Sequence, residues 1–141
     1  MTLQELSRHL KLCEKLEQDE EILAALRAKA YPGAQRLDGM PHAGGISDKT
    51  GYLGAVIADM EASVKALRKD IAAERVILQA YVDSLEDERI RAIIQLRFIC
   101  CMQWKEVAYM MGRNYSDGKV RGMIYEFLKK TEQEATDDSP K

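Results

Sequence analysis

The apolar seam between Leu53 and Leu85 constrains the fold more than any other feature of this sequence. Its positions alternate steps of four and three residues, which is the spacing of a helix that packs along another helix. They are Leu53, Ile57, Met60, Val64, Leu67, Ile71, Glu74, Leu78, Tyr81 and Leu85. Only Glu74 is charged, and because an unpaired buried carboxylate is costly we expect it to pair with a basic residue or to lie at a hydrated point. The seam predicts one long helix over residues 47–82.

A helix of this length needs a partner. It would be roughly 50 Å long at about 1.5 Å per residue, too long for the small C-terminal part of the chain to cover. The nearest candidate is residues 2–29, which contain no Pro or Gly and repeat leucines at helical spacing. Residues 31–47 hold two prolines and four glycines without periodicity, which predicts a loop. We therefore expect an antiparallel coiled-coil hairpin over residues 1–83; a second copy of the chain is the other candidate partner, and both can coexist in a dimer.

Composition excludes several classes of protein. The chain has 141 residues, of which 46% are hydrophobic and 31% are charged, as expected for an ordered, soluble protein. No stretch approaches the ~20 apolar residues of a membrane span, and the N-terminal residues alternate charge with leucine, so neither secretion nor membrane insertion is expected. The cysteines Cys13, Cys100 and Cys101 lack C-x-x-C spacing, which favours reduced thiols and a cytoplasmic location.

The pattern changes after residue 83. Ser84 and Asp87 resemble a capping box that restarts a helix, and a second helix is predicted over residues 104–111. Gly112 is the expected C-cap of that helix, and Ser116 the expected N-cap of a third. The side chains expected to face inward are Ile90, Ile93, Ile94, Phe98, Val107, Ala108, Met111, Val120, Ile124 and Phe127. This predicts an all-α protein in which a three-helix domain over residues 84–130 precedes an acidic disordered tail over residues 131–141.

The last two of these helices have the pattern of a helix-turn-helix motif. The small residue Ala108 lets two helices cross closely, Gly112 turns the chain, and the third helix keeps one face exposed for the major groove of DNA. Residues 85–130 hold 9 Lys and Arg against 6 Asp and Glu, whereas the whole chain has a net charge of −2. Periodicity alone is equally consistent with an ordinary corner of a helical bundle.

Residues 85–112, LEDERIRAIIQLRFICCMQWKEVAYMMG, resemble the first two helices of a sigma-70 region-4-type domain. The resemblance is strongest to phage late transcription regulators of the RinA and ArpU type. The matching residues are Leu85, Asp87, Arg89, Arg91, Leu96, Arg97, Phe98, Trp104, Glu106, Val107, Ala108 and Gly112. Residues 44–61, GGISDKTGYLGAVIADME, resemble the entry to the long helix of those proteins. The resemblance thus covers most of residues 1–130 and implies a small phage or prophage DNA-binding protein.

The third helix and the turn before it carry the candidate DNA-binding residues. They are Arg113, Asp117, Lys119, Arg121, Gly122, Tyr125 and Lys129. The turn is two residues longer than in the family, because Arg113 and Asn114 precede the Tyr-Ser pair, and Asp117, Gly118 and Gly122 stand where the family carries long polar side chains. Phosphate contacts from the cations are therefore expected ahead of contacts to bases.

No catalytic or metal-binding motif is evident. His9 lies in a polar helix and His42 in the loop, neither with a second ligand at metal spacing, so solvated imidazoles are expected. Without a phosphate loop or a nucleophile motif, neither an enzyme activity, a cofactor nor a small-molecule substrate is expected. The expected partners are double-stranded DNA and a second copy of the chain, and RNA polymerase is a further candidate partner. The alternative is a phage assembly or DNA-packaging protein that uses the same helices for oligomerisation.

Overall fold

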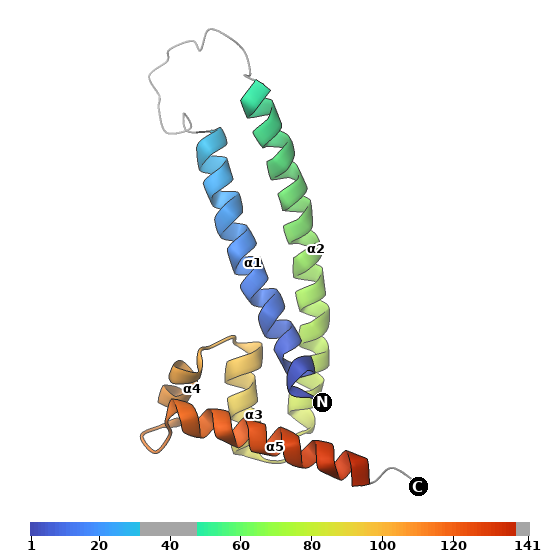
Figure 1. The fold of residues 1–141 in the computed structure, drawn as a ribbon, viewed down its shortest axis with the longest axis vertical. Coiled ribbons are helices and arrows are strands. Elements are labelled where there is room, and N and C mark those ends of the chain that lie inside the picture. Colours follow the sequence, from blue (N-terminus) through green and yellow to red (C-terminus); the bar gives the residue numbers. More distant parts are fainter. Residues whose placement is uncertain (32–47, 138–141) are drawn as a thin grey trace. The chain divides into compact units, whose positions relative to one another are not determined.

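The computed structural model describes residues 1–31 and 48–137, and both ranges are helical almost throughout (Figure 1). The elements in chain order are α1 (Leu3–Ala30), α2 (Asp48–Ser84), α3 (Glu88–Ile94), the π-helical segment η2 (Gln95–Ile99), α4 (Trp104–Met111) and α5 (Asp117–Asp137). No strand occurs within the described ranges, so the predicted all-α class is confirmed. Of the loop predicted over residues 31–47, residues 32–47, with His42, lie outside the described residues.

The chain divides into two compact units at a different place from the predicted boundary at residue 83. The hairpin unit is Glu14–Asp70, and the larger unit combines Met1–Cys13 with Ile71–Lys141. The reason is that Leu6 and Leu10 of α1, with Leu78 and Val82 of α2, share one buried cluster with the helices that follow. The first helical turns of α1 and the last turns of α2 therefore belong to the C-terminal domain's core.

In the hairpin unit α1 and α2 form the predicted antiparallel pair, which is confirmed. Leu23 and Ala30 of α1 are buried against Ile57 and Val64 of α2, and the seam residues Leu53 and Met60 pack against this cluster. Two ion pairs between the helices flank it, Arg27–Glu61 with an N–O distance of 2.8 Å and Arg68–Glu20. These pairs are largely exposed, so burial of the seam is the larger source of stability.

In the larger unit the seam continues through Leu78, which is buried, and through Tyr81 and Leu85, which are partly buried. Glu74, the only charged seam position, lies with its Oε1 3.7 Å from Nη1 of Arg8 on α1. The glutamate side chain is 22% exposed and the arginine side chain 60%. The expected basic partner is thus confirmed, and partial hydration keeps the cost of this carboxylate low.

The helices after residue 84 enclose an apolar core. Its buried members are Ile90, Ile93, Ile94, Phe98, Ile99, Val107, Ala108, Val120, Ile124 and Leu128. The inward-facing positions predicted on all three helices are confirmed, with Met111 and Phe127 partly buried at the edge. The predicted capping box is wrong in its cap residue: Asp87 accepts hydrogen bonds from the backbone N–H groups of Arg89 and Ile90, while the Ser84 hydroxyl donates to the Tyr81 carbonyl. The Asp87 carboxylate therefore accepts two N–H groups of the first helical turn, whereas the Ser84 hydroxyl, which donates to an earlier carbonyl, accepts none of them.

The turn between α4 and α5 has the predicted caps. Gly112 has φ of 120°, and its N–H donates to the Ala108 carbonyl. The hydroxyl of Ser116 accepts a 3.2 Å hydrogen bond from the N–H of Lys119, as an N-cap does. α5 continues to Asp137, so residues 131–137 of the expected disordered tail are helical, with the Thr131 hydroxyl bonded to the Phe127 carbonyl. Residues 138–141 lie outside the described residues.

None of the described helices combines the length and apolar character needed to cross a membrane.

Candidate nucleic-acid interface

α5 is held to its unit by one face and exposes the other. Val120 and Ile124 have no exposed surface, and Leu128 is 4% exposed. These positions follow the helical repeat, so residues 118, 122, 125 and 129 lie on the opposite side of the helix. In Figure 1 this helix lies beside α3 and α4, and its inner face packs against both. The packing fixes which side chains of α5 a partner can reach.

The two cations near the start of α5 are exposed but already have local contacts. The Nζ of Lys119 donates to the backbone carbonyl of Asn114 at 3.0 Å and lies 4.9 Å from the ring centre of Tyr115. Nη2 of Arg121 lies 2.8 Å from Oδ1 of Asp117, one helical turn away. Both arginine and aspartate side chains are more than two-fifths exposed, so solvent screens this pair. Asp117 reduces the positive potential at the start of the helix, whereas Lys119 is held close to the turn.

The remaining predicted residues extend this surface along α5. Tyr125 is 45% exposed, and its ring meets that of Trp104 edge-to-face with the centres 6.5 Å apart. Lys129 is exposed one turn after Tyr125. Gly122 is half-buried and lies between Gly118 and Tyr125 along the helix. Arg113 is exposed in the turn before α5. Six of the seven predicted residues therefore share this helix, and Arg113 adjoins its start.

A groove beside the start of α5 was not predicted. It is lined by Met102, Lys105, Glu106, Ala108, Tyr109, Met110, Tyr115, Ser116 and Asp117. Tyr109 is 85% exposed and Met110 59% exposed at its edge. The groove is mostly apolar, and its charged lining residues are Lys105, Glu106 and Asp117, so two carboxylates offset its one cation and it does not suit a phosphate group. The sequence feature that could have indicated this groove is the pair Tyr109 and Met110, two large apolar residues that lie outside the buried face of α4.

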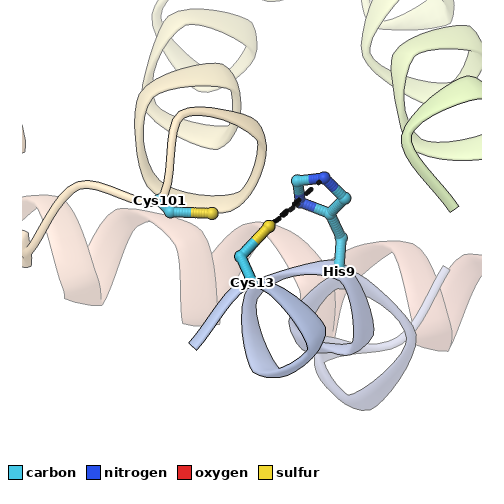
Figure 2. Close-up of side chains that lie close together, drawn as sticks. All are labelled: His9, Cys13 and Cys101. Atoms are coloured by element: carbon cyan, nitrogen blue, oxygen red, sulfur yellow. Dashed lines mark hydrogen bonds between the residues drawn. The ribbon is translucent and has the colours of Figure 1, made fainter. Parts of the chain in front are cut away.

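The expectation that His9 is a solvated imidazole is wrong. His9 is 1% exposed, and its Nδ1 lies 2.7 Å from the carbonyl oxygen of Phe98, 89 residues away. Phe98 lies in the π-helical segment, whose last carbonyls have no partner within the helix, so the buried ring satisfies one of them. Cys13, one turn along α1, has its Sγ 3.7 Å from Nε2 of His9 (Figure 2). The H-x-x-x-C spacing of His9 and Cys13, which places both side chains on one face of a helix, is the sequence feature that could have indicated their proximity.

Cys101 completes a cluster with these two residues. Figure 2 shows its Sγ directed toward that of Cys13, beside the ring of His9. The three donor atoms lie within 4.8 Å of one another. Burial, and then a hydrogen bond of the neutral Cys101 thiol to Cys13, raise the pKa of the Cys101 thiol to about 12, so this thiol is protonated at neutral pH. Cys100, its neighbour, is exposed and does not belong to the cluster.

Arg97, one of the residues that match the resemblance, is held by contacts within the larger unit. Its Nη1 donates to the Met102 carbonyl at 2.7 Å. Its guanidinium lies 5.1 Å from the ring centre of Trp104, which also meets Phe98 edge-to-face. Arg97 therefore supports the connection between η2 and α4.

Comparison with known proteins adds no relative. No known protein family matches the sequence. No curated protein matches it, and no solved structure matches the fold.

Proposed function

We propose that residues 84–130 are a helix-turn-helix domain that binds double-stranded DNA, resembling sigma-70 region 4, in a phage or prophage transcription regulator. The observation that carries this proposal is the outer face of α5, which exposes Lys119, Arg121, Tyr125 and Lys129 while Val120 and Ile124 anchor the opposite face. A recognition helix needs this division, because one face must hold the domain together while the other enters the groove.

The electrostatics favour contacts to the DNA backbone. A cation contributes to phosphate binding by proximity alone, and Lys119, Arg121 and Lys129 can all move toward a phosphate without disturbing the core. Gly118 and Gly122 present no side chain on the outer face of the first two turns, so DNA can approach the backbone of α5 closely there. We infer affinity that is modest and strongly dependent on salt, with ~3 to 5 phosphate contacts per domain.

Changing Lys119 and Arg121 together to alanine should lower affinity for duplex DNA by at least about tenfold, equivalent to roughly 1.4 kcal/mol or more. Both side chains are exposed and their local contacts are screened, so helical content and melting temperature should stay nearly unchanged. Fluorescence anisotropy with a labelled random-sequence duplex at low salt, repeated over a salt series, measures the affinity and its slope.

The matched control changes Lys65 and Lys69 to alanine. These two exposed lysines lie one turn apart on α2 in the hairpin unit, so the net charge changes by the same amount far from α5 in sequence. Equal losses in both double variants would mean that binding depends only on total charge. An unaltered affinity in the α5 variant, or no binding by the parent at low salt, would leave α4 and α5 as a bundle corner and favour an assembly role.

We also propose that the chain forms a homodimer, with its helical arm available for dimerisation or for contact with RNA polymerase. The seam itself packs against α1 within each described unit, so a dimer would use another surface. On α2 in the larger unit, Val76 is 70% exposed and Ile77 58% exposed, and Ala72, Ala73 and Ala80 around them are exposed too. Such an apolar helical face suits a symmetric contact with its own copy.

Sedimentation equilibrium at micromolar concentration should therefore show a species of twice 16.0 kDa. Changing Val76 and Ile77 together to glutamine should shift the population toward monomer without loss of helical content, because both side chains are outside the core. A parent protein that sediments only as a 16.0 kDa species would contradict the dimer.

A further inference from the structure

The cluster of His9, Cys13 and Cys101 combines donors that metal ions of intermediate softness prefer. Two thiols and one imidazole form the donor set of zinc sites, whereas hard cations such as Mg²⁺ and Ca²⁺ select oxygen ligands. All three residues belong to the larger unit, so the cluster lies within one compact body. His9 is 1% exposed, and the thiols of Cys13 and Cys101 are partly buried.

The hydrogen bond of His9 orients the ring for coordination. A carbonyl oxygen can only accept, so Nδ1 must carry the hydrogen that reaches the Phe98 carbonyl at 2.7 Å. In the neutral ring Nε2 then keeps its lone pair, and the Sγ of Cys13 lies 3.7 Å from Nε2 and 3.8 Å from Nδ1. A histidine that binds a metal through one nitrogen commonly donates the other N–H to a backbone carbonyl, which fixes the tautomer and the ring orientation.

The distances suit a tetrahedral ion. With Zn–S near 2.3 Å and Zn–N near 2.0 to 2.1 Å, a sulfur and a nitrogen on the same ion are separated by roughly 3.6 Å. The Sγ of Cys13 and the Nε2 of His9 are 3.7 Å apart. All three donor atoms lie within 4.8 Å of one another, so closing the set around one ion requires only small side-chain movements.

The backbone at Cys101 is held in an unusual conformation. Its φ is 60°, and among the described residues it is the non-glycine residue with a positive φ. A side chain in this left-handed region costs of order 1 kcal/mol, and such strain occurs most often where a residue must be placed for function. Here it directs the Cys101 thiol toward α1, at the end of a π-helical segment that also supplies the carbonyl partner of His9.

We propose that Nε2 of His9 and the Sγ atoms of Cys13 and Cys101 bind one Zn²⁺ ion, with water as the fourth ligand. On binding, each thiol releases its proton to solvent and each thiolate donates an electron pair to the ion, while the imidazole binds in its neutral form. The two thiolates balance the charge of the ion. Because the ligands come from α1 and from the connection between η2 and α4, the ion links the N-terminal helix to the proposed DNA-binding domain.

Competition with a chromophoric zinc chelator tests the stoichiometry on the full-length chain, kept reduced with a phosphine. We expect one Zn²⁺ per chain. Substituting Co²⁺ should produce thiolate-to-cobalt charge transfer in the near ultraviolet and the intense visible bands of a tetrahedral site. Zinc at about 100-fold above its Kd should raise the melting temperature by roughly 10 °C. Octahedral cobalt spectra, or binding with no thermal shift, would overturn the proposal.

Single variants test the ligands. Cys13→Ser and Cys101→Ser should each weaken zinc binding by about 100-fold or more, above the 10- to 100-fold cost of losing a hydrogen-bond partner of a ligand. Both thiols are only partly buried, so the metal-free variants should keep the parent's helical circular dichroism. Cys100→Ser is the matched control, since Cys100 is exposed beside Cys101 and is outside the cluster. Equal loss in the Cys100 variant would overturn this ligand assignment.

The two thiols could instead pair with each other. In aerated buffer without reductant and without metal, dissolved O₂ would then oxidise the pair, and the chain would lose two thiols by colorimetric titration and two hydrogens by intact mass. A disulfide that forms in the presence of zinc would overturn the metal site. If zinc protects both thiols from an alkylating reagent and a chelator reverses the protection, the metal site is supported. A disulfide would not explain reversal by a chelator. His9→Gln tests the third ligand. This variant removes the Nε2 lone pair that would bind the ion, whereas Cys13→Ser keeps that lone pair and removes a thiolate.

Discussion

Replacing Phe98 with alanine should lower the free energy of unfolding by about 3 to 5 kcal/mol, the usual cost of truncating a buried aromatic side chain. Phe98 is 2% exposed, and its ring meets the Trp104 ring edge-to-face with centres 6.0 Å apart. It lies in the one cluster that joins the ends of α1 and α2 to α3, α4 and α5. The cavity would therefore open at the centre of the larger unit, where rigid helices on several sides limit collapse.

Urea denaturation followed by two signals measures this effect. Trp104 is the single tryptophan of the chain, so its fluorescence reports the larger unit, while circular dichroism at the helical minimum reports all helices. Met110→Ala is the control, because Met110 is 59% exposed and its truncation should change stability by about 0.5 kcal/mol or less. A loss of less than about 1 kcal/mol in the Phe98 variant would mean that this cluster is not the cooperative core.

Changing Gly112 to alanine should cost about 1 to 3 kcal/mol, although nothing lies within 4 Å of the added methyl group. The cause is the backbone: Gly112 has φ of 120° and ψ of 179°, a region that is essentially reserved for glycine. The residue ends α4 and sets the direction in which the chain reaches α5. An alanine there must either keep a strained conformation or alter the turn between the two helices.

Gly118→Ala is the matched control for this substitution. Gly118 also has open space around the position of an added methyl group, but it is the second residue of α5 and has helical backbone. Alanine is favoured over glycine by roughly 0.5 to 1 kcal/mol in a helix interior, so in this first turn the variant should be more stable than the parent by about 0.5 kcal/mol or less. Two identical chemical changes six residues apart should thus have opposite signs in thermal or urea denaturation. Stabilisation by both would show that the turn tolerates a different backbone path.

The helices and their buried faces could be predicted because their causes are local. The seam of α2 follows a 3.5-residue repeat, and burial of Ile57, Val64, Leu67 and Leu78 matches it. Gly112 and Ser116 terminate and start helices through their own backbone and hydroxyl chemistry. The exposed positions on α5 follow from the same reasoning, since Val120 and Ile124 determine which side of that helix is covered.

Two differences from the expected helix ends involve local hydrogen bonds. Asp87 rather than Ser84 caps α3, because the Ser84 hydroxyl reaches back to the Tyr81 carbonyl. α5 extends beyond residue 130, where the Thr131 hydroxyl donates to the Phe127 carbonyl of the same helix. Tertiary contacts decided the division of the chain, which no local pattern contains. The division into units fell at residues 13 and 70 because Leu6 and Leu10 are buried in the C-terminal core.

His9 shows the same limit most clearly. Only the fold brings it to the Phe98 carbonyl, 89 residues away in the sequence, and to Cys101. The helical repeat places His9 and Cys13 on one face of α1, but it carries no information about which distant segment covers that face. A side chain's periodicity specifies its direction from its own helix, whereas its burial and its partners depend on how separate helices pack.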